Sequence, residues 1–124
     1  MKKIIFTEKA PKAIGPYSQA VEINGTLYIS GQVPIIPETG EMPEGIQAQT
    51  EQVMKNIGAI LNAAGYSYDH VVKSTCLLSD MDNFKAMNEV YGAYYKVNPP
   101  ARAAYGVVKL PLGALIEIET IAIK

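Results

Sequence analysis

The sequence predicts an α+β protein in which two helices lie on one face of a mixed β-sheet, in the order βββαβαββ. An Asn24-Gly25 pair between two strand-like runs predicts a hairpin near the N-terminus. Two later segments repeat their apolar residues at helical spacing. Strand-like runs rich in apolar and β-branched residues follow each helical segment, which favours packing of both helices against one sheet.

The N-terminal part of the chain is predicted to form three strands separated by loops and a tight turn. Asn24 and Gly25 both tolerate positive φ angles, so the hairpin loop needs only these two residues. The prolines and glycines of residues 9–16 and 34–43 favour loops there. The strands are expected at Lys2–Phe6, Ser18–Ile23 and Thr26–Val33.

Helical periodicity predicts one helix over Glu44–Ala64 and a second after Asp80. Gly65 follows the first helix as a natural C-terminal cap. Either Asp80 or Asp82 can cap the second helix, and Pro99-Pro100 ends it. The apolar stripe of the second helix comprises Phe84, Met87, Val90 or Tyr91, and Tyr94.

Three further strands are predicted at Val71–Leu78, Ala101–Val108 and Ala114–Ile123. The last of them carries apolar residues on both faces, whereas two helices can cover only one face of the sheet. We therefore expect the other face to be buried against another copy of the same chain. The two apolar sets are Ile116, Ile118 and Ala122 on one face and Leu115, Ile121 and Ile123 on the other.

Length, charge and composition exclude several classes of protein. The 124 residues suit one domain, residues 1–124, and no apolar run approaches membrane-spanning length. The net charge is −1 with scattered Lys and Arg, which argues against nucleic-acid binding. The N-terminus turns polar too early for a signal peptide, and the lone Cys76 rules out an internal disulfide. These features favour a cytoplasmic protein.

Arg102 is a permanent cation within an apolar strand, and no acidic residue lies near it in the sequence. A buried guanidinium cannot lose its proton, so it needs an anion. Its planar fork matches a carboxylate in two-point fashion, and such charge-assisted bonds contribute on the order of 1.5–3 kcal/mol each. The functional interpretation is a socket for a small carboxylic acid, and the alternative is an ion pair with an acidic side chain of the protein.

Glu117 and Glu119 lie on one face of the last strand, between apolar residues. A carboxylate there is costly unless it is paired or used. Glu117 could orient and activate water, or it could meet solvent or pair with Lys109 at a strand edge. If the strands of Arg102 and Glu117 pair in a hairpin, the two side chains could lie close together, either as a salt bridge or on two sides of a ligand.

Four other residues are weaker candidates. Tyr17 follows a Gly-Pro turn, although packing is the usual role of a tyrosine. Ser30 and Gly31 interrupt a strand, which indicates either a bulge or close approach to a ligand or another chain. Asn88 lies among the apolar residues of the second helix and could hydrogen-bond across a subunit boundary or face solvent.

The sequence shows no pattern for a metal or nucleotide cofactor. One histidine and one cysteine cannot build a zinc site, and no other cluster has ligand spacing. Glycine-rich phosphate loops, Gly-x-Ser-x-Gly elbows and dinucleotide fingerprints are all absent. An enzyme of this sequence would therefore work with a cation, a carboxylate, hydroxyls and water.

Together, four motifs in order make the chain, from Ile4 to Ile123, resemble the reactive intermediate deaminase A (RidA) family, the enamine/imine deaminases of the YjgF type. The motifs are Ile14-Gly15-Pro16-Tyr17-Ser18-Gln19, Ser30-Gly31-Gln32-Val33-Pro34, Pro100-Ala101-Arg102 and Ile116-Glu117-Ile118-Glu119.

The resemblance implies a chorismate-mutase-like plait assembled as a homotrimer with a cleft between each pair of subunits. It also implies hydrolysis of 2-aminoacrylate, 2-iminobutanoate and related enamines or imines to 2-keto acids and ammonia, without cofactor or metal. The unstable substrates of the family are released by pyridoxal-phosphate-dependent dehydratases.

By position, the resemblance assigns a role to each candidate. Arg102 would hold the substrate carboxylate and Glu117 would position the attacking water. Gly31 and Tyr17 would contact the substrate or its water, and the cleft would also be lined by Ser30 and Asn88. Two positions depart from the family. Ala104 stands where many members have a cysteine, which implies a roomier cleft and puts thiol-dependent properties in doubt, and Val108 stands where the family often has a smaller residue.

Two alternatives to the deaminase remain. One is a non-catalytic sensor or carrier of small keto or amino acids, which would use Arg102 without needing Glu117. The other is the ribonuclease or translation-inhibitor activity of some relatives. The scattered basic residues and the lack of a histidine pair argue against the ribonuclease.

Overall fold

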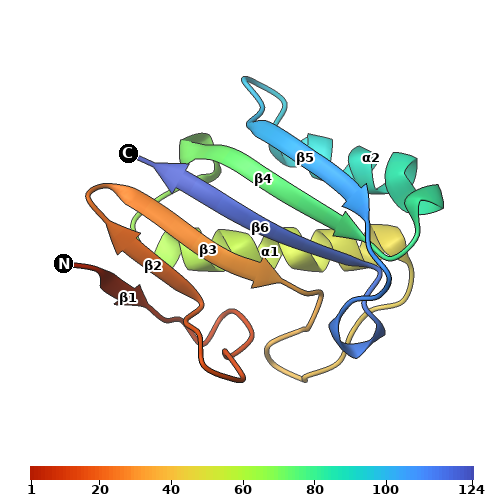
Figure 1. The fold of residues 1–124 in the computed structure, drawn as a ribbon, viewed down its shortest axis with the longest axis horizontal. Coiled ribbons are helices and arrows are strands. Elements are labelled where there is room, and N and C mark those ends of the chain that lie inside the picture. The colour runs from red at the N-terminus through yellow and green to blue at the C-terminus, as the bar shows by residue number, and fades with distance from the viewer.

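The computed structural model covers residues 1–124 and contains six strands and two α-helices in the predicted order (Figure 1). Three short 3-10 helices, at Tyr68–His70, Met81–Asn83 and Pro111–Gly113, lie in the connections. The main elements are β1 (Lys3–Ile5), β2 (Ala20–Ile23), β3 (Thr26–Gln32), α1 (Ile46–Ala63), β4 (Val71–Leu78), α2 (Phe84–Tyr94), β5 (Ala101–Gly106) and β6 (Ile116–Ile123).

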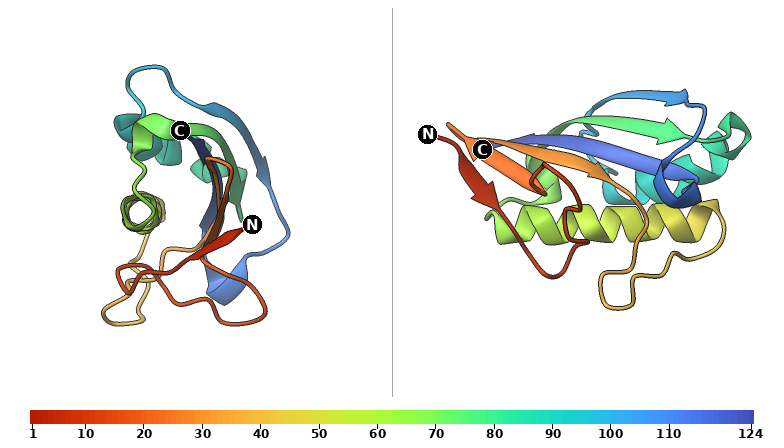
Figure 2. Two further views of the ribbon diagram at one scale, coloured as in Figure 1. Left: turned by 90° about the vertical axis from the view of Figure 1, so that its left-hand side faces the viewer. Right: turned by 60° about the horizontal axis from the view of Figure 1, so that its bottom comes forward.

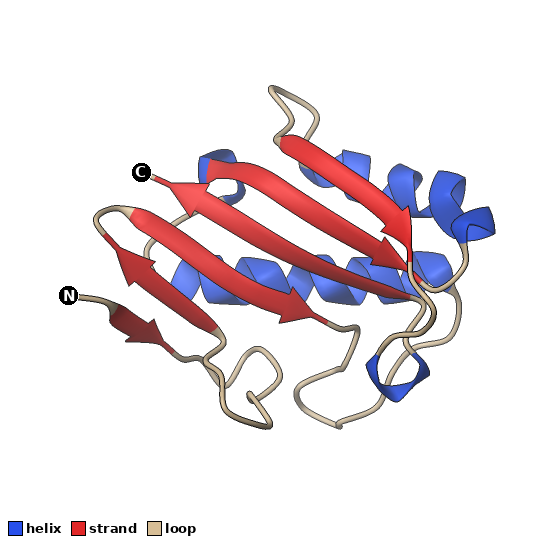
Figure 3. Cartoon of the chain, in the orientation of Figure 1, coloured by secondary structure: helices blue, strands red, loops and turns tan.

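The six strands form one mixed sheet in the order β1-β2-β3-β6-β4-β5 (Figure 3). Only β4 and β5 pair in parallel, because α2 carries the chain back along the sheet between them. Both helices lie on the same side of the sheet (Figure 2). The α+β class with two helices on one face of a mixed sheet is confirmed.

A hairpin between the strands of Arg102 and Glu117, the condition for their proximity, does not form. The central strand β6 pairs with β3 on one side and β4 on the other, and β5 is the outer neighbour of β4. The physical reason is that the α2 crossover docks β5 in parallel on the free edge of β4. The loop after β5 then has to cross to the far side of β4.

Local sequence signals set the element ends. Asn24 and Gly25 adopt φ angles of 50° and 79°, as the hairpin turn requires. Gly45, with φ 89°, precedes α1, so the helix starts at Ile46, two residues later than predicted. Asp80 accepts a hydrogen bond from the backbone N–H of Asp82 at 2.9 Å, which caps the 3-10 turn leading into α2.

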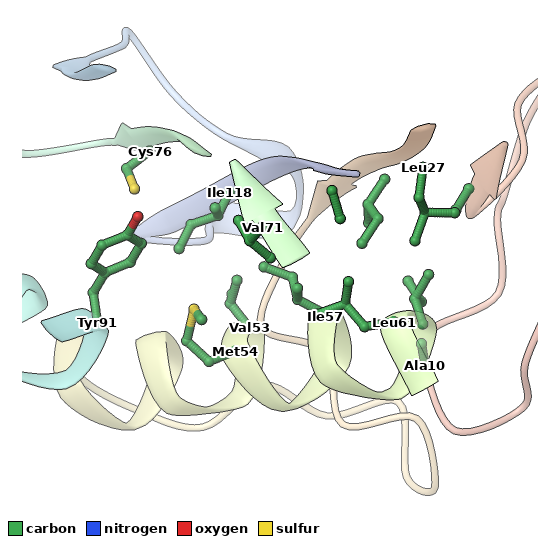
Figure 4. Close-up of a cluster of buried hydrophobic side chains, with 14 of the residues drawn as sticks. Ala10, Leu27, Val53, Met54, Ile57, Leu61, Val71, Cys76, Tyr91 and Ile118 are labelled. Atoms are coloured by element: carbon green, nitrogen blue, oxygen red, sulfur yellow. The ribbon is translucent and has the colours of Figure 1, made fainter. Parts of the chain in front are cut away.

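The core lies between α1 and the sheet (Figure 4). On β6 the helix-facing residues are fully buried, whereas Ile121 is half-buried and Ile123 is exposed on the other face. We call this second face the open face of the sheet. Neither helix is both long and apolar enough to cross a membrane. The buried core includes Leu27, Ile116 and Ile118 from the sheet and Ile57 and Leu61 from α1.

Candidate functional site

The six candidate residues fall into two groups on opposite sides of the sheet. Side chains alternate along a strand, and residues paired across strands share a face. Arg102 pairs with Ser74, which is fully buried beneath the helices, so Arg102 faces α2. Glu117 pairs with Leu77, which alternates with the buried residues of β4, so Glu117 lies on the open face.

The first group surrounds Arg102 on the edge strand β5. The Nη1 atom of half-buried Arg102 donates a hydrogen bond to Oδ1 of Asn88 at 2.7 Å. The guanidinium carbon lies 5.4 Å from the ring centroid of Phe84 and 5.0 Å from that of Tyr91. The hydrogen-bond partner is therefore a neutral amide, whereas the ion-pair alternative required a carboxylate.

The contact with Arg102 fixes the orientation of the Asn88 amide. A guanidinium has only donors, so the Asn88 oxygen must face it, and the two amide N–H groups point away. This corner of the molecule consequently presents hydrogen-bond donors from both side chains. An arginine without a formal counter-charge and an adjacent amide donor can bind an anion such as a carboxylate.

The second group surrounds Glu117 on the open face. Burial raises the pKa of this half-buried carboxyl, and the negative charge of Glu119 raises that pKa further. Gly31 lies at an irregularity of the β3–β6 pairing, where the register shifts between Ile29 and Gln32. A Cβ atom at Gly31 would collide with the Glu117 carboxylate and lie 2.8 Å from its Cδ atom. The irregular pairing expected at Gly31 is therefore present, and the backbone there lies close to the Glu117 side chain of the same chain.

Ser30 and Tyr17 belong to this second group. Ser30 Oγ donates to the carbonyl of Ser18 at 2.6 Å, which ties β3 to the segment before β2. Tyr17 is 54% exposed rather than packed in the core, and its hydroxyl accepts a hydrogen bond from the Ile14 N–H at 3.4 Å. A hollow of about 780 Å³ on this face is lined by Tyr17, Ser30 and Glu119 among others.

Two residues of the Arg102 group were not singled out from the sequence. Phe84 and Tyr91 appear there only as members of the apolar stripe of the second helix. The available signal was the i, i+4, i+7 spacing of Phe84, Asn88 and Tyr91, because this spacing places all three residues on one helical face. Which strand that face meets depends on the tertiary fold.

The two departures at Ala104 and Val108 occupy different surroundings. Ala104 lies on the same side of β5 as Arg102 and packs against the core. Val108 follows β5 and is 99% exposed. Buried Cys76 pairs with Ala104 in the sheet, and burial raises the pKa of its thiol to about 11.

No group of three or more His, Cys, Asp or Glu side chains could hold a metal ion.

The family model described as Endoribonuclease L-PSP matches residues 7–124. The chain belongs to this family. It is 50% identical to the 2-iminobutanoate/2-iminopropanoate deaminase of Mus musculus over 125 aligned positions, covering 100% of this chain and 93% of that protein. The RidA resemblance drawn from the four motifs is thereby confirmed.

Solved structures of family members share the fold. RidA from the Antarctic bacterium Psychrobacter superposes with a TM-score of 0.96 at 49% identity, covering 98% of this chain and 99% of that one. Escherichia coli TdcF with bound serine gives a TM-score of 0.94 at 39% identity, covering 98% of each chain. The similarity extends over nearly the whole α+β architecture.

Proposed function

We propose that this protein hydrolyses small 2-imino and 2-enamino acids, such as 2-iminobutanoate and 2-aminoacrylate, to 2-keto acids and ammonia. The observation that carries the proposal is the half-buried Arg102, whose hydrogen-bond partner is a neutral amide and which therefore retains an uncompensated charge for a substrate carboxylate. The names of relatives at about 50% identity support the reaction class. TdcF, the relative with bound serine, shows that a family member accepts a small amino acid.

In the proposed reaction, Arg102 holds the carboxylate and Glu117 orients a water molecule toward the imine carbon. Glu117 takes a proton from the water as the water oxygen bonds to the imine carbon, and it passes this proton to the imine nitrogen. In the resulting carbinolamine, Glu117 moves the hydroxyl proton to the nitrogen: the C–N bond breaks, the nitrogen leaves as ammonia and the C–O bond becomes the keto group. An imine carbon is already electrophilic, so binding, orientation and one proton shuttle are sufficient, and neither a metal nor a cofactor is invoked.

The site is proposed to form between two subunits of a homotrimer. Within one chain, Arg102 and Glu117 lie on opposite faces of the sheet, so one small substrate cannot contact both. One subunit would supply Arg102 and Asn88. Its neighbour would supply the open-face group, namely Tyr17, Ser30, Gly31 and Glu117. The half-exposed apolar residues of the open face support burial against another chain.

The deciding experiment is a coupled assay with a threonine or serine dehydratase, which releases the imine in solution. We expect the protein to accelerate loss of the imine absorbance and release of the 2-keto acid. No acceleration would contradict the proposed function. An RNA-cleavage assay on the same preparation tests the activity in the family's description, and cleavage lost on Arg102→Ala would support that alternative.

The activity should fall at acidic pH with an apparent pKa above the ordinary range for glutamate. Glu117 must be ionised to accept a proton, and burial together with Glu119 raises its pKa, so protonation and loss of kcat/KM begin at a higher pH. Glu119→Gln removes the like charge and should move this acid limb to lower pH. An acid limb that stays in place in Glu119→Gln would contradict the assignment of the limb to Glu117.

Gly31→Ala should reduce kcat about tenfold to a hundredfold, because the added Cβ displaces the Glu117 carboxyl from its position. The measurement is steady-state kinetics in the coupled assay. Gly92→Ala is the matched control, since a Cβ there meets nothing within 4 Å and the residue lies in α2. Equal kinetics in both variants would show that Gly31 is not needed for the Glu117 geometry.

A further inference from the structure

The Arg102 guanidinium is held by three side chains of one helix. Asn88 accepts its Nη1 hydrogen bond at 2.7 Å, and the rings of Phe84 and Tyr91 lie 5.4 Å and 5.0 Å from its central carbon. We infer that Phe84 and Tyr91 are positioning residues that fix the plane of the Arg102 guanidinium for binding of a planar carboxylate. The inference rests on the proposed function in so far as that carboxylate belongs to the substrate.

A cation at this place in the fold needs external support. Arg102 is the second residue of the edge strand β5, so only one neighbouring strand flanks it. Its long side chain has many rotamers, and ordering them at the moment of binding would weaken the complex. Two ring faces within about 6 Å of the cation reduce that freedom before the ligand arrives.

Aromatic partners also preserve the charge that the ligand needs. A carboxylate at position 84 or 91 would hold the guanidinium equally well but would neutralise it and occupy its N–H donors. A ring attracts the cation through its quadrupole and takes no in-plane N–H group. The arrangement therefore restrains Arg102 and leaves part of its donor fork available.

Tyr91 contributes its ring rather than its hydroxyl to this contact. The residue is only 5% exposed, and Figure 4 shows its hydroxyl pointing toward Cys76, deep beneath β4. The buried hydroxyls of Tyr91 and Ser74 each lack a hydrogen-bond partner. Tyr91→Phe therefore keeps the ring beside Arg102 and removes only the hydroxyl, whereas Tyr91→Leu removes the ring.

The test measures binding of 2-ketobutyrate by calorimetry, together with KM and kcat in the coupled assay. In Phe84→Leu we expect Kd and KM to rise roughly tenfold while kcat changes less than about twofold, because the Glu117 side of the reaction is untouched. Phe84→Tyr keeps an aromatic ring at this position and should keep Kd near the wild-type value. An unchanged Kd in Phe84→Leu, or a Phe84→Tyr variant as weak as Phe84→Leu, would overturn the inference.

A second aromatic residue of α2 provides the matched control. Tyr94 packs against Tyr68 at a centroid distance of 5.2 Å, so its ring serves the aromatic cluster beside η1 (Tyr68–His70). Tyr94→Leu should therefore leave Kd unchanged. If Tyr91→Leu does not fold, Phe84→Leu and Tyr91→Phe still test the inference. Loss of the ring at position 84 should raise the Kd for 2-ketobutyrate, whereas loss of only the hydroxyl at position 91 should leave it unchanged.

The outcomes separate this inference from the proposed function. If wild type binds 2-ketobutyrate, Phe84→Leu binds it more weakly and neither accelerates imine hydrolysis, the positioning role stands and the deaminase proposal fails. If wild type accelerates hydrolysis and Phe84→Leu does so with the same KM, the deaminase proposal stands and the positioning role fails.

Discussion

Replacing Arg102 by alanine is expected to lower kcat/KM for imine hydrolysis about a thousandfold. The substitution removes two charge-assisted hydrogen bonds to the substrate carboxylate, each contributing on the order of 1.5–3 kcal/mol, and every 1.4 kcal/mol is about a factor of ten. The coupled dehydratase assay measures the loss. Binding of 2-ketobutyrate, followed by calorimetry, should disappear in parallel.

Arg102→Lys separates the charge from the planar fork. Lysine keeps the positive charge but offers no bidentate geometry, so we expect an activity between those of wild type and Arg102→Ala. We expect both variants to fold, because Arg102 lies on an edge strand outside the buried core. Thermal unfolding checks this expectation. Wild-type activity in a folded Arg102→Ala protein would refute the carboxylate socket.

Glu117→Gln is expected to lower kcat by about a hundredfold to ten-thousandfold while 2-ketobutyrate still binds, because glutamine cannot accept a proton from water. Stability should not suffer at neutral pH. Burial holds the pKa of folded Glu117 above its unfolded value, so the stabilising contribution of the protonated form is lost as pH rises and the ionised form opposes folding. A Glu117→Gln or Glu117→Ala variant that binds 2-ketobutyrate and keeps wild-type turnover would favour the non-catalytic sensor alternative.

Mixing the two inactive variants tests the shared site directly. If each site takes Arg102 from one subunit and Glu117 from the next, a mixed assembly of Arg102→Ala and Glu117→Gln chains contains some sites with both native residues. Random reassembly of equal amounts should then restore about a quarter of wild-type activity. The mixture is unfolded and refolded together, and separately refolded variants combined afterwards are the control. No recovery in a folded mixed assembly would contradict a site that takes Arg102 and Glu117 from different subunits.

Much of the fold could be predicted from the sequence, because its signals are local. The Asn24-Gly25 turn needs only two residues with positive φ. Gly65 after α1 and Asp80, which caps the 3-10 helix before α2, each hydrogen-bond to residues no more than three positions away. Five of the six candidate site residues lie in the four sequence motifs, and the sixth, Asn88, was named from its place on the second helix. Their division into two groups was not predicted.

The tertiary structure alone decided how those residues are arranged. The short loop between β5 and β6 suggested that these two strands pair as a hairpin, but β4 lies between β5 and β6 in the sheet. Strand order depends on pairing across long sequence separations, and a shift of one residue in register moves a side chain to the other face. Local residue patterns established which helices and strands form and which residues carry charge. Only the assembled sheet decided that Arg102 faces α2 and Glu117 the open face, because register is fixed by which apolar faces are buried together.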